Sequence, residues 1–275
     1  MKFVEKAIGL IDETLFNSIN LFSNSQQIII TALNSQSQPF ISQFTEKFSD
    51  FIQIPGRVRQ LIGQDILVSI GFDSKLYVSY PPYVGWATLN ILASKLHAVS
   101  KSTEFHIIYS YQCKLFDVIL INQQGQQVFV KSQIDTNVDE SNIILSESKQ
   151  QLTLYYKKSD GQILKRVFTN SWSEQKIVRG KAQQLAYNNE LIMFNGQILE
   201  TDIVQYFSYI DEVLCYVNQT GNIQIGKQIF GLSQSQIKGI KFKGNYYFVY
   251  INIDGGIRCI MSNEDLNELD LDLFF

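Results

Sequence analysis

The sequence is poor in charged residues, and in arginine above all. Only 18% of its 275 residues are Asp, Glu, Lys or Arg, and the formal net charge is −3. The arginines are Arg57, Arg59, Arg166, Arg179 and Arg258. They are too few to form a basic stripe that could neutralise several phosphates. We therefore expect no nucleic-acid binding, and a surface that is polar mainly through the amides and hydroxyls of Gln, Asn and Ser.

Cysteine and histidine are also scarce. Cys113, Cys215 and Cys259 lie far apart among apolar or aromatic residues without CxxC spacing, a pattern typical of buried free thiols. His97 and His106 have no cluster of cysteines or carboxylates around them, so we expect no metal site. Nucleotide-binding glycine loops and the GxSxG nucleophile motif are missing too. We expect neither a cofactor nor catalytic residues.

Long apolar runs are missing as well. No apolar span of about 18 residues occurs, so we expect no membrane-spanning helix. Glu5, Asp12 and Glu13 interrupt the N-terminal segment, which argues against a secretory signal peptide. The chain is therefore expected to be made in the cytoplasm.

Apolar residues recur at helical spacing in the first 62 residues. Spacings of three, four or seven predict amphipathic helices, the second of which begins near Ser37 and Pro39 and ends at Pro55-Gly56. Residues 28–33 fit a helix or a strand, and we prefer a helix. We expect residues 1–62 to be a helical attachment arm whose apolar stripe packs on the rest of the chain, a second copy or another protein subunit. The stripe consists of Val4, Ile8, Ile11, Leu15, Phe22, Phe40, Phe44, Phe48 and Phe51.

After Gln64 the pattern changes to short alternating runs. These runs are rich in β-branched and aromatic residues, which predicts strands. Several end in a turn with glycine, which supplies the positive φ of a tight hairpin. The predicted turns are Gln124-Gly125, Asp160-Gly161, Asn195-Gly196, Thr220-Gly221 and Asp254-Gly255.

The strongest signal is an internal repeat. Gly85-Trp86-Ala87 aligns with Ser171-Trp172-Ser173 at an offset of 86 residues, with a more divergent copy between them around residues 143–155. A repeated all-β unit of roughly 43 residues is typical of a β-propeller blade, which needs neighbouring blades to cover its faces. We predict a mainly β fold with about five blades in residues 63–275. A β-sandwich or a β-helix is the alternative.

Repeats that begin with tryptophan and end in an Asp-Gly or Asn-Gly turn resemble the blades of sialidase-like and lectin-like propellers. Lectin propellers carry one sugar pocket in each blade. The resemblance thus implies that Trp86 and Trp172, together with Tyr80 and Tyr83, stack on sugar rings. A repeated position favours the other interpretation, in which the two tryptophans fill the core between blades.

A propeller glycosidase is the less favoured alternative. Ser159-Asp160-Gly161 lacks the closing Thr-Trp of a complete sialidase Asp-box, and Arg166 and Arg179 fall on predicted outer strands or turns. A glycosidase could use carboxylates as its acid and base, and the candidates are Asp65, Asp117, Asp202 and Asp211. None of them belongs to a recognisable motif, so we interpret them as ordinary aspartates in turns.

We therefore expect a non-catalytic structural or interaction protein, a propeller displayed on a helical arm, with a lectin as the alternative. The low-charge surface is similar to that of an accessory protein of a bacteriophage particle, in its fibre, neck or tail, so a virion or another extracellular assembly is the expected location. Expected partners are other protein subunits, a surface glycan and a second copy of the chain. Residues 264–275 alternate acid and leucine and are expected to close the ring, or to dock into a neighbouring subunit.

Overall fold

All regular structure in the described part of the chain is β-strand. The structure, a computed structural model, describes residues 1–8, 15–23, 26–45, 47–101, 104–123, 126–148, 151–178, 184–188, 190–194, 197–198, 202–210 and 213–263. None of these residues lies in a helix. Accordingly, no helix within these ranges is long and apolar enough to cross a membrane.

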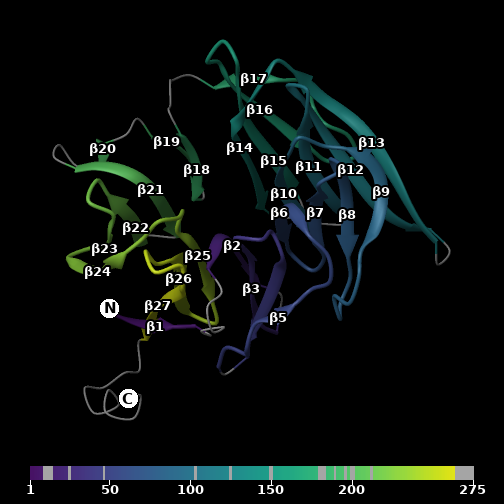
Figure 1. Ribbon diagram of the computed structural model, residues 1–275. Helices are drawn as coiled ribbons and strands as arrows, with labels where there is room; N and C mark the ends of the chain where they lie inside the picture. The colour runs from purple at the N-terminus through teal and green to yellow at the C-terminus, as the bar shows by residue number, and fades with distance from the viewer. Residues whose placement is uncertain are drawn as a thin grey trace. The chain divides into compact units, whose positions relative to one another are not determined.

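The chain forms two compact units, each discontinuous in sequence. The first unit contains Met1–Ser35, Ile41–Ile52 and Ile198–Phe275, and the second contains Gln36–Phe40 and Gln53–Gln197. Both are built from antiparallel meanders in which consecutive strands are hydrogen-bonded neighbours (Figure 1).

The second unit contains three four-stranded sheets, β6 to β9, β10 to β13 and β14 to β17, followed by the pair β18 and β19. The first strand of each sheet packs against the first strand of the next, β6 with β10, β10 with β14, and β14 with β18. This packing of first strands is the arrangement of blades in a propeller. The strands are β6 (Val58–Gly63), β7 (Leu67–Gly71), β8 (Lys75–Ser79), β9 (Ala87–Leu92), β10 (Lys95–Lys101), β11 (Phe105–Tyr111), β12 (Lys114–Gln123), β13 (Gln126–Thr136), β14 (Val138–Ser148), β15 (Gln151–Lys158), β16 (Ile163–Phe168), β17 (Lys176–Val178), β18 (Gln184–Asn188) and β19 (Glu190–Phe194).

The remaining three sheets belong mostly to the first unit. Their orders are β2-β3-β4-β5, β20-β21-β22-β23-β24 and β1-β27-β26-β25, and β25 packs against both β2 and β21. The strands are β1 (Lys2–Ala7), β2 (Phe16–Ser23), β3 (Ile28–Asn34), β4 (Pro39–Phe44), β5 (Ile52–Gln53), β20 (Gln197–Ile198), β21 (Asp202–Ile210), β22 (Val213–Asn218), β23 (Asn222–Ile225), β24 (Gln228–Leu232), β25 (Lys238–Phe242), β26 (Asn245–Ile251) and β27 (Ile257–Asn263).

The N-terminal strand completes the last sheet. β1 pairs antiparallel with β27 from Lys2 opposite Asn263 to Ala7 opposite Arg258. The two chain ends are thereby joined by a ladder of main-chain hydrogen bonds, and the sheet reaches four strands without residues 264–275. The ring-closing role expected of those residues lies outside the described part of the chain.

The helical arm predicted for residues 1–62 is wrong. The described part of this segment forms β1 to β5 and most of β6, so the predicted boundary at residues 62 and 63 falls inside a strand. The spacing of four that suggested a helix has another origin. Phe44 and Phe48 form an isolated antiparallel bridge, which brings their ring centroids to 4.6 Å across a chain reversal instead of along a helical turn.

Four of the nine residues assigned to the arm's apolar stripe are buried, and three are half-buried. Phe51, for example, is buried with its ring centroid 5.4 Å from that of Phe16 on β2. Leu15 is an exception with 56% of its surface exposed, and Ile11 lies outside the described residues. The buried members are Ile8, Phe22, Phe40 and Phe51. The half-buried members are Val4, Phe44 and Phe48.

The number of blades was also underestimated, since the described residues form seven sheets where about five were expected. The repeat itself has a structural counterpart. Trp86 stands directly before β9 and Trp172 shortly before β17, which are the last strands of their sheets. The offset of 86 residues therefore spans two sheets, and the more divergent copy predicted around residues 143–155 falls on β14 and β15.

Three of the predicted glycine turns are confirmed. Gly161, Gly221 and Gly255 have φ values of +91°, +84° and +80°, which favour glycine. The turns Gln124-Gly125 and Asn195-Gly196 lie outside the fully described residues. Of the cysteines, Cys215 and Cys259 are buried as expected, whereas Cys113 is exposed.

Candidate functional site

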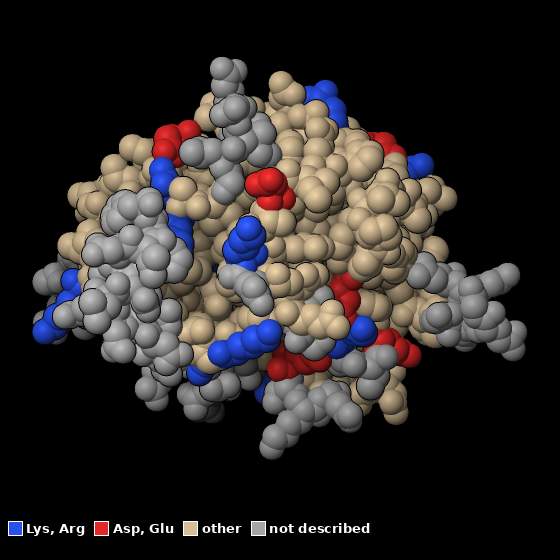
Figure 2. Space-filling model, turned by 90° about the horizontal axis from the view of Figure 1, so that it is seen from below, with Lys and Arg blue, Asp and Glu red and all other residues tan. Residues whose placement is uncertain are grey.

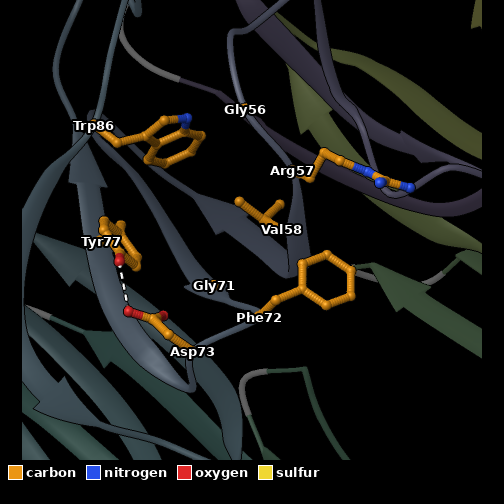
Figure 3. A pocket seen from close by; sticks show the side chains of 8 residues that line it. All are labelled: Gly56, Arg57, Val58, Gly71, Phe72, Asp73, Tyr77 and Trp86. Carbon is orange, nitrogen blue, oxygen red and sulfur yellow. Dashed lines mark hydrogen bonds between the residues drawn. The ribbon is translucent and has the colours of Figure 1, made fainter.

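A pocket of about 280 Å³ lies beside Trp86 in the second unit (Figure 3). It is formed by the segment that leads into β6, by the hairpin between β7 and β8, and by the residue that precedes β9. The lining residues are Gly56, Arg57, Val58, Gly71, Phe72, Asp73, Tyr77 and Trp86.

Trp86 is held by one edge of its indole. Nε1 donates a hydrogen bond of 2.8 Å to the carbonyl oxygen of Pro55, and the side chain is half-buried. Gly56 follows Pro55 with a φ of +99°, a left-handed conformation that glycine adopts without strain. The Pro55-Gly56 turn thus fixes the ring while leaving it beside the pocket.

The β7–β8 hairpin presents two side chains to the pocket. Its loop is Phe72-Asp73-Ser74, in which Ser74 has a φ of +63° and donates its N–H to the Gly71 carbonyl at 3.1 Å. This is the geometry of a three-residue hairpin loop closed by a left-handed residue. Arg59 on β6 also donates to the Gly71 carbonyl at 3.1 Å. Phe72 is thereby held at the pocket with 61% of its surface exposed.

Asp73 supplies a carboxylate next to the rings. Tyr77 donates its hydroxyl to Asp73 Oδ2 at 2.8 Å, and the main-chain N–H of Lys75 donates to Oδ1 at 3.1 Å. The Tyr77 hydrogen bond lowers the pKa of Asp73 and raises that of Tyr77. A side chain at Gly71 would place Cβ 2.7 Å from Tyr77 Cε2, so glycine is needed for the tyrosine ring to lie there.

Aromatic rings flank the pocket on two sides. Figure 3 shows Trp86 and Tyr77 on one side and Phe72 on the other, with Arg57 directed away from the indole. Arg57 Nε donates to the carbonyl oxygen of Gln36 at 2.8 Å. Rings with a few polar groups suit a ligand that has an apolar face and a polar rim. The volume is slightly below the range of about 300–1,000 Å³ usual for drug-sized ligands, so the pocket suits a single ring.

Tyr80 and Tyr83 do not line this pocket. Tyr83 follows the cis Pro81–Pro82 peptide bond with a φ of +61° and is buried. Its hydroxyl donates to the Asp65 carbonyl at 3.3 Å, and burial raises its pKa to about 12. Tyr80 packs against the apolar core of β6 to β13. The structure therefore assigns both tyrosines contacts within the fold.

Trp172 lies in a different environment from Trp86. Its Nε1 donates to Asp117 Oδ2 at 2.9 Å, and the same oxygen is 2.8 Å from Nδ1 of His106. The Trp172 ring also packs edge-on against Phe168, with a centroid distance of 5.3 Å. His106 and Asp117 are fully buried. Trp172 thus joins the sheet of β14 to β17 to that of β10 to β13, as the core interpretation expects.

A second polar cluster is centred on Asp135. Its carboxylate accepts hydrogen bonds from Tyr156 at 2.5 Å and from Lys158 at 2.8 Å, and Arg166 Nε donates to the Tyr156 hydroxyl at 3.1 Å. Burial raises the pKa of Asp135, but the hydrogen bonds from Lys158 and Tyr156 outweigh it, so the pKa is lowered. The donors and acceptors satisfy one another, which indicates a structural role.

The acids considered for a glycosidase have other contacts where the structure describes them. Asp65 forms an ion pair with Lys101 at 2.7 Å, and Asp117 is enclosed with His106 and Trp172. The side chains of Asp202 and Asp211 lie outside the described residues. No group of three metal-ligating side chains occurs in the described ranges.

Sequence reasoning found Trp86 but missed the residues that complete its pocket. Phe72 and Asp73 lie in a short loop and Tyr77 lies in a strand. The alternating pattern predicted the strand there but no binding role for these residues. A signal was present, because a phenylalanine in the polar hairpin loop Phe72-Asp73-Ser74 has no core to fill.

The sequence matches no protein family and no curated protein, whereas solved structures of β-propeller and lectin proteins resemble most of the chain. BBS1N, solved in complex with ARL6DN, has a TM-score of 0.63 at 10% identity, over 96% of this chain and 97% of that one. Kluyveromyces lactis Hsv2 has a TM-score of 0.54 at 9% identity, over 87% and 91%. The SapL1 lectin, solved with alpha methyl fucoside, has a TM-score of 0.51 at 9% identity, over 85% and 87%. These likenesses show the fold, so the chain has a β-propeller-like fold.

Proposed function

We propose that the chain is a non-catalytic recognition protein that binds a sugar ring in the Trp86 pocket. The observation that carries the proposal is the combination, in one pocket, of a half-buried indole with an ionised carboxylate. The C–H face of a pyranose packs on an aromatic ring, while its hydroxyls donate to carboxylate oxygens. Asp73 can accept such bonds because each carboxylate oxygen has more than one acceptor position.

Two further points support this proposal. The Trp86 indole is already oriented by Pro55, so binding does not have to order it, which reduces the entropic cost of association. Among the similar folds, the SapL1 lectin was solved in complex with alpha methyl fucoside. The broader expectation of a propeller that binds a partner agrees with BBS1N, whose structure is a complex with ARL6DN.

A glycan array followed by isothermal titration calorimetry with the free monosaccharide tests the proposal. Truncation of a central aromatic contact costs about 2 kcal/mol or more, or about 30-fold in affinity, so Trp86→Ala is expected to abolish measurable binding. Phe72→Ala, which alters an exposed side chain, should weaken binding without affecting folding. Asp73→Asn keeps the shape of the pocket and should also weaken binding.

Two variants serve as controls. Ile177→Ala removes an exposed apolar side chain on β17 and should leave affinity unchanged. Trp172→Phe alters the other tryptophan and should lower stability but not affinity. Sugar binding that survives Trp86→Ala, or a complete lack of glycan binding, would refute the proposed site.

The setting in a phage particle remains a prediction from composition. The named structural neighbours carry no information about it, and the helical arm on which the attachment idea rested is not present in the described residues. A propeller glycosidase remains the less favoured alternative, because Asp65 and Asp117 are both engaged within the fold.

A further inference from the structure

The outer edge of β13 differs from the other outermost strands. β13 has eleven residues, whereas β5, β9, β17 and β24 have two, six, three and five. It is the last strand of its sheet, with β12 on one side and no hydrogen-bonded strand among the described residues on the other. Proteins usually protect such edges by keeping them short or by placing charges or proline on them.

The middle of this strand is apolar on both faces. Val128, Phe129 and Val130 are 39%, 43% and 48% exposed. Because successive side chains of a strand point to opposite faces, the two valines lie on one face and the phenylalanine on the other. The run therefore has no single face that its own sheet could bury.

Lys131, the residue that follows this run, does not protect the edge. Lys131 Nζ lies 4.4 Å from the centroid of the Phe116 ring and 5.9 Å from that of Tyr109. Both aromatic residues belong to the same sheet as β13, so the ammonium group is drawn over that sheet instead of extending from the strand edge. Figure 2 shows, for one face of the molecule, how sparse the charged side chains are.

We propose that β13 pairs with β13 of a second copy of this chain, antiparallel about a two-fold axis at Phe129. The sequence of the strand is self-complementary in this register. Phe129 meets Phe129 of the second copy, and Val128 meets Val130, so each apolar residue faces another. Lys131 comes opposite position 127, a glutamine, and no like charges face one another.

This pairing joins two four-stranded sheets into one continuous sheet of eight strands. Two identical surface patches related by a two-fold axis form the commonest kind of protein dimer. The contact surface is only one strand edge with three apolar side chains from each copy, which places it at the low end of specific interfaces, below about 1,200 Å². We therefore expect a reversible dimer that dissociates on dilution. This inference is independent of sugar binding at Trp86.

Sedimentation equilibrium of the full chain, with Phe129→Lys and Phe129→Glu, tests the proposal. The wild type should dimerise in a concentration-dependent way at micromolar to millimolar protein. Each variant alone should dimerise at least about tenfold more weakly, because like charges then meet at the axis. An equimolar mixture of the two variants should restore the dimer, because lysine then faces glutamate.

Ile177→Lys is the matched control, since it places the same charge at an exposed apolar position on another outermost strand of the same unit. It should dimerise as the wild type does. If circular dichroism shows that a Phe129 variant is unfolded, Val128→Thr with Val130→Thr retains strand-forming residues and should still weaken the dimer.

Three results would overturn the proposal. The first is a wild type that stays monomeric up to millimolar concentration. The second is a dimer that folded Phe129→Lys or the threonine variant leaves intact. The third is a mixture of the lysine and glutamate variants that stays monomeric, because the register at Phe129 would then be wrong.

Discussion

Replacing Asp117 with alanine should destabilise the fold severely, because two donors depend on one carboxylate oxygen. Trp172 Nε1 and His106 Nδ1 lie 2.9 and 2.8 Å from Asp117 Oδ2. Both Asp117 and His106 have no exposed side-chain surface. As a carboxylate, Asp117 can only accept hydrogen bonds, and Nδ1 of His106 is then the donor of this contact. Alanine would leave both donors without this acceptor, and the one from fully buried His106 could not turn to water instead.

The expected loss of stability follows from the two hydrogen bonds that Asp117→Ala removes. A buried donor left unsatisfied costs about 1–3 kcal/mol, and Trp172, which is only partly buried, belongs at the lower end. His106 and its contact are fully buried, so losing that hydrogen bond belongs at the upper end of this range. We therefore expect Asp117→Ala to lower the free energy of unfolding by about 3–4 kcal/mol. Asp117→Asn keeps one acceptor and should cost about 1–2 kcal/mol.

Urea unfolding followed by far-ultraviolet circular dichroism measures these differences. Glu174→Ala removes an exposed carboxylate near Trp172 in sequence and should change stability by less than about 0.5 kcal/mol. A loss of stability in Asp117→Ala no larger than that of Glu174→Ala would contradict the role assigned to Asp117. A double-mutant cycle with Trp172→Phe should also give a non-zero interaction energy, because both substitutions remove the same hydrogen bond.

Three further substitutions test local electrostatics. With Asp135→Asn, the stability advantage of the wild type should be complete at neutral pH and disappear as pH falls through the lowered pKa of Asp135; an advantage that persists at all pH values would contradict this. Burial lowers the pKa of His97 to about 3, with a contribution from a nearby lysine, whereas an unfolded histidine titrates near about 6.5. As pH falls from about 6.5 to about 3, the wild type should therefore lose up to about 1.4 kcal/mol of its free energy of unfolding per pH unit. His97→Gln should reduce this dependence of stability on pH, as measured by urea unfolding at each pH. Tyr77→Phe should raise the pKa of Asp73 towards its ordinary value, which an NMR titration of the carboxyl carbon would detect as a midpoint shift.

The repeat was predictable because it depends on periodic burial. Trp86 and Trp172 stand at corresponding places before the last strands of their sheets, and such a position recurs whenever a sheet is duplicated. Alternation after Gln64 likewise predicted strands, because one residue in two faces a neighbouring sheet. These signals concern residues close in sequence, so no tertiary information was needed to read them.

The first 62 residues were misread because their pattern is ambiguous without the tertiary structure. Residues Ile28–Asn34 form β3, whose seven residues are all buried, and a continuous apolar run of this length fits a covered strand as well as a helix. The pairing of β1 with β27 joins segments more than 250 residues apart. No local pattern can indicate such a partner.

The two tryptophans show why a repeat predicts position better than chemistry. Trp86 donates to the main-chain carbonyl of Pro55 at a turn, and its ring remains beside a pocket. Trp172, at the corresponding place, donates to a buried carboxylate on the preceding sheet and becomes part of the core. The difference arises from Asp117 and His106, which lie on β12 and β11 and are remote from Trp172 in sequence. Whether a repeated tryptophan lines a ligand pocket therefore depends on which group accepts its indole hydrogen bond. That group is remote in sequence, so the sequence of the repeat alone does not predict the role of the tryptophan.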